Sequence, residues 1–160
     1  ASAATVLDTT DSGGPALDLL ADSYSFDENF HVGDMGGTLT FSFENTSAST
    51  AAVTFFGWSV EQNLAAFTDG VELTFGTYTA SVAEGVSTGS NTNFLVGAGQ
   101  TVTLMIEYGA VFDLPPEFVD DFANIDFTVQ AAIVPVPAAG LLLLTALGGI
   151  AVMRRRKAAA

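Results

Sequence analysis

Apolar and polar residues alternate with a period of two in several short segments of the chain. The four clearest segments are residues 38–44, 71–75, 101–108 and 125–131. A period of two places alternate side chains on opposite faces of an extended strand, so these segments predict half-buried β-strands. Weaker alternation predicts further strands at residues 24–32, 53–60, 77–82 and 93–96.

The remaining pattern favours an all-β domain. The phase of residues 53–60 shifts near Gly57, which predicts a β-bulge there. Brief helices are expected only at residues 61–67 and 116–122. About eight strands separated by turn-rich pieces, with no long amphipathic helix, predict an antiparallel β-sandwich or jelly roll.

The C-terminal segment has a different pattern. Residues 131–153 form a run of 23 residues without a charged side chain. The most apolar part, 138–153, is somewhat short for a membrane span, so we expect residues 134–137 to lengthen the helix, with the prolines in its first turn. This run predicts one C-terminal transmembrane helix; a buried core helix is the alternative. The expected organisation is an N-terminal segment (1–20), a β-sandwich (21–133), a motif and span (134–153) and a tail (154–160).

Charge is divided sharply along the chain. The only Lys and Arg residues are Arg154, Arg155, Arg156 and Lys157, whereas all 18 acidic residues precede them. A basic cluster after an apolar run keeps that end of a span in the cytoplasm, which predicts a periplasmic β domain. So acidic a domain excludes nucleic acid as a partner. The chain has no cysteine, which excludes disulfides and thiolate metal sites.

The end of the chain resembles a known sorting signal. It consists of a proline-containing motif, a leucine-rich run and a basic cluster, and the motif residues are Val134, Pro135, Val136, Pro137 and Ala138. Together these resemble a PEP-CTERM-type tail, most closely the VPLPA-CTERM variant of alphaproteobacteria, with Val136 where the commonest form has leucine. The resemblance implies export, a single span and an exosortase that processes the chain near the motif. The small residues at positions 1–4 are similar to a signal-peptide cleavage region, so we expect an exported chain.

Residues suited to catalysis are few, and the sequence predicts a protein that is not an enzyme. His31 is the only histidine, and no phosphate-binding loop, dinucleotide fingerprint or nucleophile elbow occurs. No cofactor is expected apart from a weak candidate for Ca²⁺, whose oxygen ligands would be Asp27, Glu28, Asn29 and Asp34. Ordinary solvated acids are the alternative. The aromatic residues Phe55, Phe56 and Trp58 fit either a carbohydrate-stacking platform or the core.

Two main functions remain open. The first is an exported, membrane-anchored, non-enzymatic protein with a structural, envelope or surface-matrix role, located at the inner membrane or, once processed, at the cell surface. The second is an uncleaved single-span accessory subunit of an inner-membrane complex, for example a respiratory or photosynthetic one. A calcium- or carbohydrate-binding module is a lesser alternative.

Overall fold

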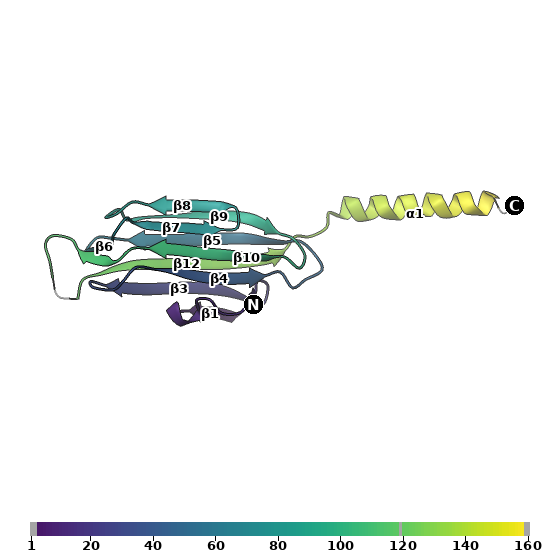
Figure 1. Ribbon diagram of the computed structural model, residues 1–160. Coiled ribbons are helices and arrows are strands. Elements are labelled where there is room, and N and C mark those ends of the chain that lie inside the picture. The colour runs from purple at the N-terminus through teal and green to yellow at the C-terminus, as the bar shows by residue number, and fades with distance from the viewer. Residues whose placement is uncertain (1–2, 119, 159–160) are drawn as a thin grey trace.

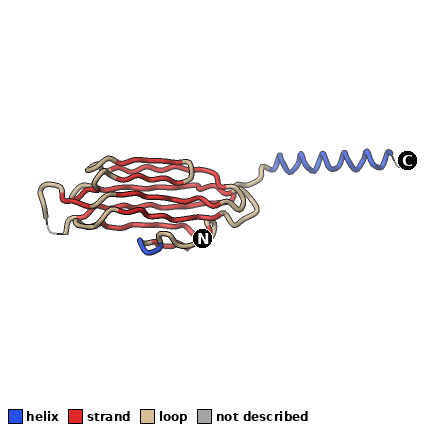
Figure 2. The backbone as a smooth tube through the Cα atoms, in the orientation of Figure 1, coloured by secondary structure: helices blue, strands red, loops and turns tan. Residues whose placement is uncertain are grey.

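The chain is mostly β-structure, arranged in two large sheets with a helix at the C-terminus (Figure 1). The computed structural model describes residues 3–118 and 120–158; the side chains of residues 3, 138–141 and 155–158 are outside that description. Figure 2 shows the strands running along a common direction and the helix leaving one end of the β domain.

The first sheet has five strands. In spatial order these are β1 (Ala3–Leu7), β3 (Asp22–His31), β12 (Phe122–Ile133), β5 (Ala51–Glu61) and β9 (Thr88–Val96). Neighbours are antiparallel except β1, which pairs with β3 in parallel. The central strand β12 alternates buried and partly exposed residues through most of its length, as the sequence pattern predicts for a strand with one face in the core.

The second sheet also has five strands. Their order is β2 (Leu17–Asp18), β4 (Gly37–Glu44), β10 (Thr101–Tyr108), β7 (Val71–Phe75) and β8 (Tyr78–Val82). Here β2 pairs with β4 in parallel. A small third sheet joins β6 (Ala65–Phe67) to β11 (Val111–Asp113), and a 3₁₀ turn, η1 (Thr9–Asp11), separates β1 from β2.

The sheets are therefore mixed, which corrects the prediction of a purely antiparallel arrangement. The N-terminal segment lays one short strand along the edge of each large sheet, in the same direction as its neighbour. Period-two alternation reports which face of a strand is buried and carries no information on strand direction, so the sequence pattern could not distinguish these parallel edges.

All four clear strands and all four weaker ones are confirmed. The two brief helices are wrong. Residues 65–67 form β6, whose three side chains are fully buried, and the described residues of 116–122 contain no helix before β12 begins at Phe122. Local composition favoured a helix at 61–67, but burial of Ala65, Ala66 and Phe67 against the sheets overrides that preference.

The predicted bulge exists, but it lies on the N-terminal side of Gly57. Opposite β12, Val53 pairs with Ala131 and Phe55 with Gln130, so Thr54 is the extra residue. Gly57 keeps regular pairing on both sides. The glycine is needed for another reason, because the Phe55 ring lies over it and a Cβ at position 57 would meet Phe55 Cζ at 2.4 Å.

Aromatic side chains from both large sheets form the core between them. Phe26 of β3 and Phe127 of β12 stack with ring centroids 5.2 Å apart, and Phe41 of β4 meets Phe127 from the opposite sheet at 5.4 Å. Phe56 of β5 likewise contacts Phe75 of β7 at 4.8 Å. These inter-sheet contacts place the two sheets face to face around one hydrophobic core.

Helix α1 (Ala138–Ala158) begins later than the sequence analysis expected. Residues 134–137 are not helical, so they do not lengthen it. Its uncharged part therefore runs from residue 138 to 153, which at 1.5 Å per residue is about 24 Å, below the ~30 Å of a hydrocarbon core. In the described part of the chain, no helix is long and apolar enough to cross a membrane, and the predicted span is not supported.

Candidate functional site

The proline-containing motif forms an exposed connection between the β domain and α1. The Val134 N–H donates a hydrogen bond to the Thr50 carbonyl at 3.0 Å, which holds the first motif residue against the domain. Residues 134–137 are all exposed and have no regular secondary structure, and Ala138 begins the helix. The sorting-motif residues are thus accessible along an extended stretch of chain.

Helix α1 carries apolar side chains on every side, and those described are exposed. Seven large ones are between 55% and 72% accessible: Leu142, Leu143, Leu144, Leu147, Ile150, Val152 and Met153. Successive helical residues are rotated by about 100°, so this set surrounds the helix and does not form one stripe. A helix that is apolar all round is normally surrounded by lipid or by other protein segments.

The basic cluster follows the apolar part of α1 without a break. Arg154 is exposed and helical. Arg155, Arg156 and Lys157 continue the helix, but their side chains lie outside the described residues.

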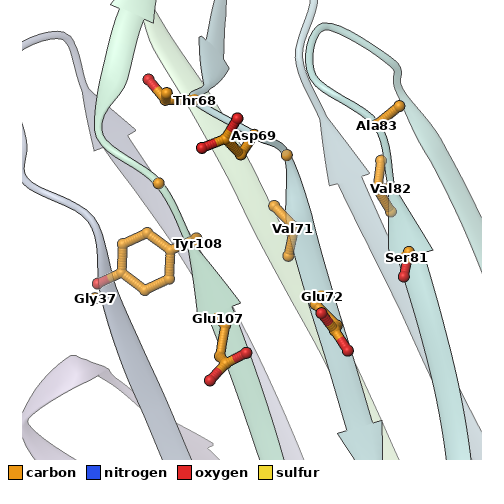
Figure 3. Close-up of a pocket in the computed structure, with 12 residues that line it drawn as sticks. Gly37, Thr68, Asp69, Val71, Glu72, Ser81, Val82, Ala83, Glu107 and Tyr108 are labelled. Carbon is orange, nitrogen blue, oxygen red and sulfur yellow. The ribbon is translucent and has the colours of Figure 1, made fainter.

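A hollow on the β domain lies on the outer face of the second sheet (Figure 3). It has a volume of about 520 Å³ and is lined by residues at the ends of β7, β8 and β10. Glu107 pairs directly with Glu72 across β10 and β7, and Ser81 of β8 pairs with Glu72 on its other side. Both glutamates are exposed. The hollow therefore offers hydrogen-bond acceptors on an acidic surface, without a basic group to activate Ser81 as a nucleophile.

Tyr108 forms one wall of this hollow. Burial raises the pKa of its phenol, and the nearby Asp34 carboxylate raises it further. Its ring also packs inward against Phe30, with centroids 4.7 Å apart. The hydroxyl consequently stays protonated at neutral pH and acts as a neutral hydrogen-bonding group.

A close approach of two backbone segments shapes the hollow. Gly70 has a positive φ of 81°, and a Cβ there would meet the Val82 carbonyl oxygen at 2.0 Å.

We expect Gly70→Ala to lower the free energy of unfolding by about 2 kcal/mol more than Gly85→Ala, because the new methyl group must push β8 away. Gly85 is the matched control, since its φ of 72° is similar but a Cβ there meets nothing within 4 Å. Urea denaturation of both variants measures the difference; equal losses would contradict the close approach.

Three of the four candidate calcium ligands, Glu28, Asn29 and Asp34, line one hollow of about 350 Å³, whereas Asp27 is not among its lining residues. Asp27 and Asn29 lie on the outer face of β3, where the Asn124 side-chain amide donates to both at 2.6 and 2.8 Å. Glu28 points to the other face, since it pairs with buried Ile125. Asp34 lies in the following turn and accepts a hydrogen bond from the His31 N–H at 2.8 Å. Among the described residues, no group of three or more acidic, His or Cys side chains could hold a metal ion.

The aromatic residues considered for carbohydrate stacking are split by the bulge in β5. Phe56 is fully buried and Trp58 is 6% exposed, and the Trp58 indole N–H donates to the Tyr78 hydroxyl at 3.0 Å. Only Phe55 is exposed, at 40%. Two of the three residues therefore belong to the core, and the described surface offers no aromatic platform at this position.

Two buried polar residues have roles that the sequence analysis did not identify. The Asn45 side chain is fully buried and donates to three backbone carbonyls, those of Ser49, Val96 and Gly97, at 2.8 to 3.1 Å. Gln62 is 1% exposed and donates to the carbonyls of Ala83 and Val86 while accepting from two backbone N–H groups. Each residue joins loops that are distant in sequence; Asn45 lies in a segment with the composition of a turn, and Gln62 lies in the segment that the sequence predicts as a brief helix.

Comparison with known proteins does not assign this chain to a family. No protein-family model matches it, and a search of curated proteins finds no match.

Proposed function

We propose that this chain is an exported, non-enzymatic protein that its C-terminal segment attaches to a membrane, with an acidic β-sandwich domain serving a structural role in the envelope or at the surface. The segment is proposed to insert into the membrane through the apolar surface of α1 from the periplasmic side, where the β domain lies. The resemblance to a sorting tail supports later processing within or next to residues 134–138.

The observation that carries this proposal is the exposure of α1. Its described side chains from Leu142 to Met153 leave a continuous apolar surface around the helix. Each large aliphatic side chain moved from water into an apolar medium contributes about 1.5 to 3 kcal/mol, so seven of them give a strong drive to leave water. Because the apolar residues surround the helix, insertion into the bilayer is favoured over lying flat at its surface, which requires one polar face.

The charge distribution of the β domain supports the same orientation. The end from which α1 departs carries the loops 45–50 and 97–100, and neither contains an acidic residue. These loops lie against each other, because the Asn45 N–H donates to the Gln100 carbonyl at 2.9 Å and the Gly99 N–H donates to the Asn45 carbonyl at 2.8 Å. The two loops can approach anionic headgroups without charge repulsion of their own, although Glu44 and the Asp18 carboxylate, which accepts a hydrogen bond from Thr46 at 3.0 Å, lie next to them.

The β domain supports a role without catalysis. The hollow at the ends of β7, β8 and β10 combines exposed carboxylates with a neutral tyrosine. His31 is exposed, and its ring meets Phe122 edge-on at 6.1 Å. Among the described residues, no hydroxyl pairs with the His31 ring, so the histidine is not placed to activate a nucleophilic side chain.

The proposal is tested by the intact mass and cellular location of the native protein. Processing of a sorting tail predicts a mature protein at the cell surface whose C-terminus falls within residues 134–140, together with a membrane-bound full-length precursor. A cytoplasmic, freely soluble protein of full length would contradict it.

A second candidate function is an uncleaved accessory subunit of an inner-membrane complex. One observation favours it: Gly148 and Gly149 have open space where a Cβ would lie, so a neighbouring helix can approach α1 closely there. In that case the native protein keeps residue 160 and purifies with partner subunits in fixed ratio. The same mass measurement therefore separates the two candidates.

A further inference from the structure

Strand β9 is a long, free sheet edge. It has nine residues and, among the described strands, pairs only with β5. The backbone N–H and C=O groups that point away from β5 therefore have no strand partner. A free edge of this kind is a ready template for another strand.

The usual features that block edge pairing are missing from β9. Natural edges are often kept short or carry charges, proline or bulges. The other edge strands fit that description, since β1 and β8 have five residues each and β2 has two. By contrast, β9 contains no charged residue and no proline, and the bulge that affects its pairing lies in β5.

The chain on either side of β9 is also free of acidic residues. No acidic residue occurs from Gly85 to Ile106, although the chain carries 18 elsewhere. Two copies of so acidic a domain repel each other over most of their surfaces. The flank formed by β9 is a place where two copies can meet without bringing carboxylates together, which favours a second copy of this chain over a basic partner.

We propose that β9 pairs antiparallel with β9 of a second copy of this chain about a two-fold axis, which joins the two five-stranded sheets into one. A symmetric contact of this kind closes after two copies and does not propagate into fibres. A register centred on Thr92, the middle residue of the strand, sets Asn91 beside the second copy's Asn93 on the outer face. It also sets Leu95, which is 68% exposed, opposite Gly89 of the second copy.

Cysteine cross-linking tests this pairing directly, because the chain has no native cysteine. Residues paired across an antiparallel ladder have Cα atoms about 4.5 to 5.5 Å apart, within the range a disulfide needs. At the two-fold axis, a single cysteine meets its own copy. We expect mild oxidation of the full-length chain in detergent to give a disulfide dimer for Thr92→Cys and for an equal mixture of the Asn91→Cys and Asn93→Cys variants, which this register places opposite each other.

The matched control is Val6→Cys, on β1 at the opposite edge of the same sheet, where the side chain is 76% exposed. A dimer held together by α1 alone would leave the β9 variants no more cross-linked than this control, and that result would overturn the proposal.

A second readout is sedimentation of Asn93→Glu, which places like charges close together across the axis. The dissociation constant of the Asn93→Glu dimer should be about tenfold higher than that of the unmodified chain. An unchanged dissociation constant would also count against the proposed pairing.

Discussion

Phe127→Ala is expected to lower the free energy of unfolding by about 4 kcal/mol, the usual scale for deleting a fully buried phenylalanine. Phe127 is 1% exposed and lies in the central strand of the first sheet. Its ring contacts Phe26, Phe41 and Phe56 at centroid distances of 5.2 to 6.3 Å, so the substitution opens a cavity where the two sheets meet. The surrounding rings belong to strands held by regular pairing and cannot collapse into the space.

Urea denaturation followed by tryptophan fluorescence measures this loss, because Trp58 is the only tryptophan and is buried in the same core. Phe118→Ala serves as the control. It removes the same side chain from a position that is 61% exposed, so the expected loss is below about 1 kcal/mol. Equal losses at the two positions would show that the two sheets do not share the core described above.

Asn45→Asp should also be damaging at neutral pH, with an expected loss of about 3 kcal/mol, because only the two hydrogen bonds that Ser47 donates to Oδ1 compensate the buried charge. The substitution replaces the amide that donates to the carbonyls of Ser49, Val96 and Gly97 with a carboxylate that only accepts. It therefore sets a negative charge against three carbonyl oxygens in a site with no exposure to solvent.

The loss should depend on pH in a defined direction. Burial against carbonyls raises the pKa of the new carboxyl in the folded state above its unfolded value of about 3.9. The variant is thus least destabilised below about pH 4, where the carboxyl is protonated in both states. The loss grows as the pH rises from the unfolded-state pKa to the folded-state pKa and levels off above it. Denaturation at pH 4 and pH 7 measures this, with exposed Ala48→Asp as the control for the added charge. A loss that is equal at both pH values would contradict the buried hydrogen-bonding role of Asn45.

The strands could be predicted from the sequence because each has one buried face. Leu39, Phe41 and Phe43 alternate with polar residues in β4, and their burial follows that alternation. Residues 65–67 have no such signal: three consecutive apolar residues are buried on all sides, a pattern that fits a helix as well as a strand. The position of the bulge was missed because Gly57 is the local irregularity in sequence, whereas the extra residue is Thr54.

The candidate sites were harder to predict, for a physical reason. The spacing of Asp27, Glu28 and Asn29 suggests a cluster, but successive residues of a strand point to opposite faces, so β3 places Glu28 on the face opposite Asp27 and Asn29. Asn45 and Gln62 show no sequence signal for a buried role, because long-range contacts bring their carbonyl partners together. The apolar run and the basic cluster could be read from the sequence because they depend on composition alone. The first residue of α1 could not, because it depends on the non-helical conformation of residues 134–137, which connect the helix to the β domain.

Flotation of the full-length chain with lipid vesicles tests the central claim, that α1 attaches the protein to a membrane. The chain should float with the vesicles and resist extraction by high salt. Leu143→Glu combined with Leu147→Glu should abolish flotation, since a charged residue at the centre of an inserted helix costs about 3 kcal/mol. Met35→Glu combined with Val86→Glu adds the same charge at exposed positions of the β domain and should leave flotation unchanged. If the unmodified chain stayed in solution, or if the α1 variant floated as well as the control, the account would be contradicted.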